Sequence, residues 1–206
     1  MEYRVVHMSS NENACQAGCF PTGRPDASER VQFFVDVANI EKGANIRYNL
    51  WRIDYDRLFL YLLKDREYAG CTAFVAGGPR GEEYAESCRR LRAIGAEIDS
   101  SGYYDENQDC QKGVDTALVS SALTKAIENR FDVAIVLSGD GDFVTLPPWI
   151  FKQGKRLEFA SFSRCVSKEI RDGPYDLTFL DGLPILESII RSDDSQDYDS
   201  MEGVYA

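Results

Sequence analysis

Histidine is almost absent from this 206-residue chain, in which His7 is the only one. Nucleophilic catalysis by serine or cysteine commonly relies on an imidazole base beside the nucleophile. Because His7 lies in an end segment, the sequence excludes a Ser–His or Cys–His system in the folded core. Any catalysis by this chain is therefore expected to use other groups.

Positive charge is also scarce. The chain has 23 lysines and arginines against 34 aspartates and glutamates, which gives a net charge of −11 at pH 7. An overall field of this sign does not attract nucleic acid. Any contact with nucleic acid is therefore expected to use a local basic face or bound cations.

Long apolar runs are missing as well. No run approaches the ~18 residues that a membrane-spanning helix needs, and residues 1–10 do not resemble a cleavable apolar leader. The six cysteines are predicted to be free thiols rather than disulfides, because the chain is long enough to build a core without such staples. These features predict a cytoplasmic protein that does not enter membranes.

The composition suits one folded domain with polar ends. Hydrophobic residues make up 44% of the sequence, which is enough for a core. Residues 1–30 are polar and interrupted by proline and glycine, so we expect a mobile arm there. Residues 191–206 are rich in aspartate and predict an acidic, disordered tail. The folded domain is expected at residues 31–190.

Between these ends, short apolar runs alternate with longer helical patterns. Strands are predicted at 31–35, 71–76, 97–100, 133–137, 157–162 and 177–180, and helices at 53–64, 81–94, 113–128, 143–152 and 166–171. Alternation of strands and helices, with strands that are apolar throughout, is typical of a parallel sheet covered on both faces. The sequence therefore predicts an α/β domain with a mainly parallel central sheet.

Four aspartates stand where such a sheet binds ligands. Asp36 directly follows the first predicted strand, and Asp140 and Asp142 follow the strand at 133–137. Ligands of open parallel sheets bind beyond the carboxyl ends of the strands, so these side chains are expected to converge. Asp115 lies in the first turn of a predicted helix, where the helix dipole favours a carboxylate.

A cluster of carboxylates without histidine or thiolate suits a hard cation. Mg²⁺ and Mn²⁺ prefer oxygen ligands, and either ion can activate water for attack on a phosphodiester. Asn39 offers a further oxygen ligand or an amide that positions water. Taken singly, each aspartate has a plainer interpretation, because an aspartate at a strand end usually caps a turn or a helix. The four together make a stronger signal than any one of them.

Three segments resemble the motifs of NYN domains, which belong to the PIN-like nuclease superfamily. The segments are Phe33-Phe34-Val35-Asp36-Val37-Ala38-Asn39-Ile40, Lys112-Gly113-Val114-Asp115-Thr116-Ala117-Leu118 and Ser138-Gly139-Asp140-Gly141-Asp142-Phe143. The resemblance implies a Rossmann-like PIN-type domain of three layers, a bound Mg²⁺ or Mn²⁺ ion, and cleavage or processing of RNA. The matched residues are Asp36, Asp115 and Asp140 at the metal-binding positions, Asp142 at a further acidic position, Asn39 at the signature asparagine and Lys112 at the motif lysine.

The sequence departs from the family pattern at two positions. Val37 stands where glycine is common, and Ser121 stands where many relatives have another aspartate. Two functions therefore stay open. The first is a metal-dependent ribonuclease, and the second is a catalytically weak or inactive module that binds RNA or regulates through a homo-oligomer or protein partner. A phosphatase with an aspartate nucleophile would need a second aspartate where Ala38 stands.

Two basic clusters are candidates for binding RNA phosphates. One comprises Arg80, Arg89, Arg90 and Arg92, and the other comprises Lys152, Lys155 and Arg156. Lys112 is a further candidate because it directly precedes the helix of Asp115. The plain alternative for each cluster is a solvated helix face.

Overall fold

A computed structural model describes residues 29–48, 53–78, 84–107 and 110–182. The expected tail at 191–206, most of the expected arm, and Arg80 lie outside the described residues. Glu29 and Arg30, which the sequence placed at the end of the arm, belong to the fold. The first strand begins at Arg30, and the Arg156 guanidinium donates to the Glu29 carboxylate at 2.7 Å.

The described residues form one seven-stranded sheet with the order β4-β3-β2-β1-β5-β6-β7. Its strands are β1 (Arg30–Asp36), β2 (Glu67–Gly77), β3 (Glu97–Asp105), β4 (Cys110–Lys112), β5 (Val133–Leu137), β6 (Arg156–Ser161) and β7 (Asp176–Phe179). Every neighbouring pair is parallel except β3 and β4, which are antiparallel. The prediction of a mainly parallel sheet is confirmed.

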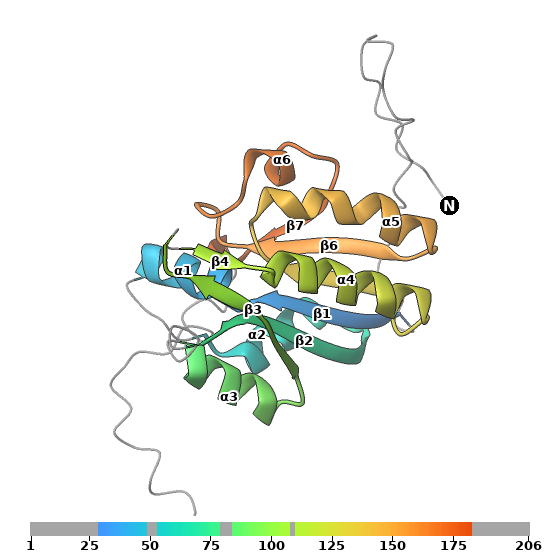
Figure 1. Cartoon of the computed structure of the whole chain (residues 1–206). Coiled ribbons are helices and arrows are strands. Elements are labelled where there is room, and N and C mark those ends of the chain that lie inside the picture. Colours follow the sequence, from blue (N-terminus) through green and yellow to red (C-terminus); the bar gives the residue numbers. More distant parts are fainter. Residues whose placement is uncertain (1–28, 49–52, 79–83, 108–109, 183–206) are drawn as a thin grey trace, which may run out of the picture.

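Helices cover both faces of this sheet (Figure 1). On one face lie α1 (Val37–Tyr48), α2 (Tyr55–Leu63) and α3 (Ala85–Ala93), and on the other lie α4 (Val114–Ile127), α5 (Leu146–Lys152) and α6 (Lys168–Arg171). Two 3-10 helices, η2 (Gly141–Thr145) and η3 (Leu180–Gly182), complete the described fold. Among these ranges, no helix is long and apolar enough to cross a membrane.

The strand pattern produces two hydrophobic cores. Along β1, Val31, Phe33 and Val35 are buried in the core beneath α1, α2 and α3, whereas Phe34 is buried in the core beneath α4 and α5. Successive side chains of a strand point to opposite faces, so a strand that is apolar throughout serves both cores. This is why β1 and β5 lie at the centre of the sheet.

Two elements were missed by the sequence analysis. Helix α1 has no clear apolar stripe, because Asn39, Glu41 and Gly43 interrupt its buried positions. The β3–β4 hairpin extends the strand predicted at 97–100 as far as Asp105. Its sequence is polar because it forms the edge of the sheet, where little apolar surface is covered.

Pro147 lies in the first turn of α5, as predicted for the prolines of that segment.

Candidate active site

The first and fifth strands deliver two aspartates to the same edge of the sheet. β1 and β5 are parallel neighbours in which Val35 pairs with Leu137. Asp36 is the last residue of β1, and Asp140 follows the end of β5 by three residues. The parallel pairing therefore brings their backbones out of the sheet side by side, as the sequence predicted.

The carboxylate of Asp36 is buried and held at both oxygens. Its Oδ1 accepts a hydrogen bond from the backbone N–H of Asn39 at 3.1 Å, which caps the first turn of α1. Its Oδ2 accepts from the Ser138 hydroxyl at 3.1 Å. The Ser138 oxygen in turn accepts from the backbone N–H of Asp140 at 3.2 Å. Ser138 thus links the two strand-end aspartates.

Asn39 has a positioning role. Its Oδ1 accepts from the backbone N–H of Gly139 at 2.9 Å and so ties the start of α1 to the turn after β5. The sequence suggested this oxygen as a metal ligand or as a group that positions water. In the structure it is engaged with the backbone, so Asn39 holds the geometry of the turn.

Asp140 and Asp142 lie on a tight turn at the start of η2. Oδ1 of Asp140 accepts from the backbone N–H of Asp142 at 3.0 Å, which makes Asp140 the cap of this 3-10 helix. The Asp142 side chain is exposed. Asp115 lies in the first turn of α4, after Gly113, whose φ of 80° allows the chain to turn from β4 into the helix. Asp36 and Asp140 thus also have a local structural role as helix caps.

The pKa of Asp36 reports its surroundings. Burial raises this pKa from 3.8 to about 6. The hydrogen bonds from Asn39 and Ser138 oppose the rise, and the negative charges of Asp115 and Asp140 add to it. The three carboxylates are therefore close enough to repel one another.

Asp115 is subject to the same kind of charge repulsion. Partial burial raises the pKa of Asp115, and the charges of Asp140 and Asp142 raise it further. In the part of the chain that the structure describes, none of the four aspartates forms an ion pair with lysine or arginine. By contrast, Asp132 and Glu86 elsewhere are neutralised by arginine, which lowers the pKa of each to about 2.

The donor set suits a hard divalent cation, although its ligands are not fully assembled. Four carboxylates with no histidine or thiolate among them match the preference of Mg²⁺ and Mn²⁺ for oxygen. Within the described ranges, however, no three acidic, histidine or cysteine side chains lie close enough together to hold an ion directly. Mg²⁺ commonly takes one or two carboxylates and keeps several waters, so the arrangement fits such an ion.

Comparison with known proteins identifies the family. The sequence model of the NYN domain matches residues 30–180. The chain belongs to the NYN domain family. This family is part of the PIN-like nuclease superfamily, as the three motifs implied. No curated protein matches the chain significantly.

A solved structure shows the same fold. It is the crystal structure of a protein of unknown function from Vibrio parahaemolyticus, which aligns with a TM-score of 0.63 at 21% identity. The alignment covers 82% of this NYN chain and 100% of the other one. At this identity the likeness concerns the fold alone.

The two departures from the NYN pattern lie in different surroundings. Val37 is fully buried in the core beneath α1, so its side chain contributes packing where relatives commonly have glycine. Ser121 lies six residues after Asp115 in α4. In a helix this spacing moves a side chain ~9 Å along the axis and roughly 120° around it. A carboxylate at this position would lie away from the face and the turn that carry Asp115.

The predicted RNA-binding residues have different surroundings. Lys112 pairs across the β3–β4 hairpin with Tyr103, just before Asp115. Arg89 and Arg90 are both engaged by Glu86, at 2.7 and 2.8 Å. The single carboxylate of Glu86 offsets part of the charge of these two arginines, so their role as phosphate ligands stays a prediction.

Lys155 and Arg156 of the second predicted basic cluster lie at the opposite ends of the strands from the aspartates. Lys155 donates to Asn129 and to Asp132, and Arg156 donates to Glu29 and Glu158. Both cations stand at the start of β6, whereas Asp36 and Asp140 stand where strands end. Their ion pairs join segments at the end of the sheet where β6 begins, which is opposite the end that carries the aspartates.

Two residues near the aspartates were missed by the sequence analysis. Ser138 lies within the third of the NYN motifs. Its hydrogen bonds to Asp36 and Asp140 form only because β1 and β5 are neighbours in the sheet. Glu169 in α6 lies beside Gly141, because a Cβ built on that glycine would be 3.0 Å from its Oε2. No local pattern marks Glu169, since only the contact between α6 and η2 brings it near Asp140 and Asp142.

A fifth carboxyl group, Glu41 of α1, is buried behind the site. It accepts hydrogen bonds from the Ser87 hydroxyl at 2.6 Å and the Tyr55 hydroxyl at 3.0 Å. Its Oε2 has no hydrogen-bond partner in the structure. Burial raises the pKa of Glu41 from 4.5 to about 7, although Ser87, Tyr55 and the charge of Arg90 oppose the rise. Glu41 joins α1 to α2 and α3, and it takes no part in the aspartate cluster.

This pKa predicts that stability rises as the pH falls through neutrality. Because the pKa of Glu41 is higher in the folded chain than in the unfolded chain, the folded state binds the proton more tightly. Between about pH 8 and pH 6, the free energy of unfolding should increase by about 1 kcal/mol from this group. Urea denaturation of the full chain with chelator at both pH values measures the change.

Glu41→Gln is the matched variant, since it cannot ionise. Its stability should change less over the same pH range, with a remainder from Asp36, whose pKa is raised in the same direction. If wild type and variant respond equally to pH, Glu41 is not the group that titrates. Ser87→Ala removes a hydrogen bond that lowers the pKa of Glu41 and should move the rise in stability to higher pH.

Proposed function

We propose that this NYN protein is a divalent-metal-dependent ribonuclease that hydrolyses RNA phosphodiester bonds. One observation carries the proposal. Asp36 and Asp140 follow neighbouring parallel strands at the same end of the sheet. The charges of Asp115 and Asp140 raise the pKa of Asp36, those of Asp140 and Asp142 raise the pKa of Asp115, and none of these four aspartates has a cationic partner among the described residues. Holding like charges together costs free energy, and a bound cation would repay it. Membership of the NYN family supports RNA as the substrate.

Asp36, Asp115 and Asp140 are the residues that would hold Mg²⁺ or Mn²⁺, one or two of them directly and the others through waters of the ion. Such an ion supplies an activated water and stabilises the negative charge that develops on the phosphate. Asp36 is held rigidly by Asn39 and Ser138, so it would fix the innermost ligand position. Asp142 is exposed at the rim, where its carboxylate can accept a proton from an attacking water or orient that water.

Histidine and thiol chemistry have no place in this scheme. Of the cysteines with described side chains, Cys71 and Cys88 are buried and Cys165 is half-buried, and all three are free thiols. Burial raises the pKa of each, so they are poor nucleophiles at neutral pH. Reduced thiols also fit the cytoplasm as the compartment in which the protein works.

The first test is the dependence of cleavage and stability on metal. Full-length protein with Mn²⁺ or Mg²⁺ should cleave mixed single-stranded RNA, and chelator should abolish cleavage. The metal should also stabilise the fold, by ~2.7 kcal/mol at 100 times its dissociation constant. Gel assays and thermal melts measure the two effects. His7→Ala should change neither, and cleavage that survives chelation would contradict the proposal.

A non-catalytic RNA-binding or regulatory module is the second candidate. It is favoured by the lack, among the described residues, of three ligands already assembled around one point. This candidate predicts RNA binding, with or without metal, and no metal-dependent cleavage by highly purified protein. A homo-oligomer or protein partner would then be the route by which it acts.

A further inference from the structure

The segment 163–168, which leads from β6 to α6, lies directly against the turn that carries Asp140. The backbone N–H of Ser167 donates to the carbonyl oxygen of Gly139 at 2.8 Å. A Cβ built on Gly139 would be only 2.1 Å from the carbonyl oxygen of Cys165. The segment therefore contacts Gly139 both at its carbonyl oxygen and at its Cα, and these contacts fix the segment against the aspartate turn.

The segment is also fixed by its own hydrogen bonds. The Arg171 guanidinium donates to the carbonyl oxygens of Ser163 at 2.6 Å and Val166 at 3.1 Å. The backbone N–H of Ser163 donates to Asp181 at 2.9 Å. The Ser167 hydroxyl caps α6 by accepting from the backbone N–H of Ile170 at 3.3 Å. Because the backbone of this segment is already ordered, binding through its outward side chains would not have to order the backbone as well.

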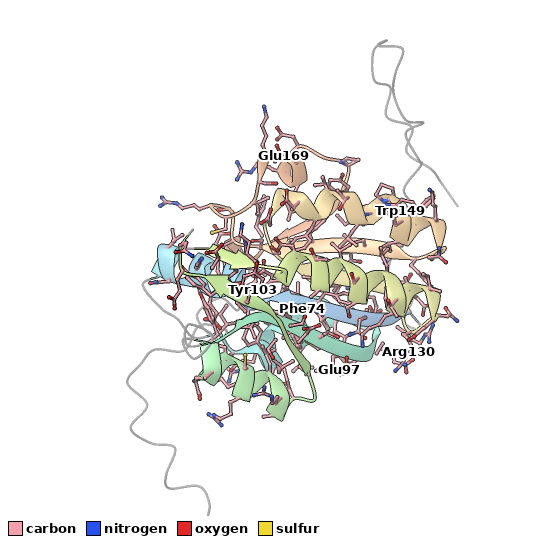
Figure 2. All side chains as sticks on the ribbon, in the orientation of Figure 1. Phe74, Glu97, Tyr103, Arg130, Trp149 and Glu169 are labelled. Atoms are coloured by element: carbon pink, nitrogen blue, oxygen red, sulfur yellow. The ribbon has the colours of Figure 1, made fainter. Side chains whose placement is uncertain are left out.

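Two of those outward side chains are cations that form no ion pair or side-chain hydrogen bond within the described residues. Arg164 and Lys168 are both exposed. Neither forms an ion pair or hydrogen bond through its side chain with any residue in the described ranges, in contrast to Arg171 at the end of α6. Lys168 directly follows Ser167, and Glu169 beside it reaches Gly141. Figure 2 shows Glu169 on α6, which marks the place of this segment in the fold.

We propose that Arg164 and Lys168 bind the phosphate backbone of RNA beside the aspartate cluster, without regard to base sequence. The proposal rests on the proposed function for its substrate, and it concerns binding rather than cleavage. A guanidinium matches two phosphate oxygens at once, and an ammonium binds phosphate as a point charge. Such contacts position the strand and carry no sequence information. They also supply the local basic face that an acidic chain needs to bind RNA.

The test measures RNA affinity of the full chain at several salt concentrations. All proteins carry Asp140→Asn to stop cleavage, and the probe is a short fluorescent single-stranded RNA. The double variant Arg164→Gln with Lys168→Gln should bind about tenfold more weakly, since each exposed charge contributes on the order of a fewfold. The slope of log affinity against log salt should fall by ~1.4, or ~0.7 for each lost phosphate contact on a single strand.

The control removes two positive charges at the other end of the domain. Arg130 precedes β5. Lys152, a member of the second basic cluster, lies at the end of α5 just before β6 begins, 4.2 Å from the centre of the Trp149 ring and at the opposite ends of the strands from Asp36 and Asp140, so we expect it to make no contact with RNA bound there. Figure 2 shows Arg130 and Trp149 away from Glu169. Arg130→Gln with Lys152→Gln should leave affinity and salt slope unchanged. Melting temperatures of both double variants establish that the fold is intact.

The outcomes separate this proposal from the nuclease. Equal salt slopes for the Arg164/Lys168 variant and its parent would overturn the proposal, as would equal losses in the two double variants. Failure of the parent to bind RNA at roughly 50 mM salt, where phosphate contacts are strong, would overturn it too. If the wild type never cleaves RNA but the Arg164/Lys168 variant loses affinity, the nuclease proposal fails and this one stands.

Discussion

Replacing Asp140 with asparagine should lower the rate of metal-dependent RNA cleavage at least ~100-fold, because loss of even a group that supports a metal ligand costs 10–100-fold. The same change should not lower the melting temperature of the metal-free protein. Asparagine keeps the side-chain oxygen that accepts from Asp142 and is as good a cap as aspartate. Activity and stability should therefore move in different directions.

The reason is the charge of the cluster. Two unit charges ~4 Å apart cost up to ~4 kcal/mol at an effective dielectric of ~20. Water in an open cleft reduces this, so neutralising Asp140 should stabilise the metal-free chain by on the order of 1 kcal/mol, or roughly 3 °C for a domain of this size. Thermal melting with chelator, and again with Mn²⁺, measures the gain and should show a much smaller metal-induced shift for the variant.

Asp65→Asn is the control, since Asp65 is an exposed residue at the edge where β2 begins. It removes the same charge and should alter neither cleavage nor the response to metal. Cleavage by Asp140→Asn at the wild-type rate would remove Asp140 from the site. A lower melting temperature for metal-free Asp140→Asn would contradict the argument from charge repulsion.

Gly139→Ala should be strongly destabilising. Its Cβ would lie 2.1 Å from the Cys165 carbonyl oxygen and 2.6 Å from the carbon of that group. The Cys165 backbone cannot easily move away, because the backbone N–H of Ser167 donates a hydrogen bond to the carbonyl oxygen of Gly139. Overpacking against backbone should cost about 3 kcal/mol. The melting temperature should fall by about 10 °C, since each kcal/mol shifts a domain of this size by roughly 2–4 °C.

Gly154→Ala separates steric overlap from backbone strain. Gly154 has a φ of 70°, but a Cβ there would meet no atom within 4 Å. Its replacement should cost only the ~1 kcal/mol of a left-handed backbone. Calorimetry or thermal melting of both variants gives the comparison. Equal stability of Gly139→Ala and wild type would mean that segment 163–168 can move away from the turn.

The placement of the strand-end aspartates was predictable from the sequence. β1 and β5 are apolar throughout, which identifies them as central strands of a parallel sheet. Parallel strands end at the same edge, so the sequence alone places Asp36 and Asp140 there. The helix of Asp115 was predicted from its regular apolar spacing, and α4 begins at Val114, within one residue of the expectation.

The supporting contacts were not predictable, because they join residues far apart in the chain. Ser138 and Asp36 are separated by 102 positions, and Asn39 and Gly139 by 100. Helix α1 was not predicted either, because the buried Glu41 interrupts its apolar pattern. Glu41 is stabilised there by a hydrogen bond from Ser87 of another helix. A local pattern carries no information about such partners.

The sequence by itself determined the fold class and the family, because apolar alternation and short motifs are local properties of the chain, and the same motifs singled out the four aspartates as candidates. Only the tertiary structure decided which cations are free. Arg89, Arg90, Lys155 and Arg156 look like an RNA-binding surface in the sequence, yet each is engaged in an ion pair within the described fold. Arg164 and Lys168 attract no notice in the sequence and are left unpaired, among the described residues, beside the aspartate turn. The physical reason is that a partner brought close by folding offsets part of a cation's charge, and a local sequence pattern does not show which cations acquire such a partner.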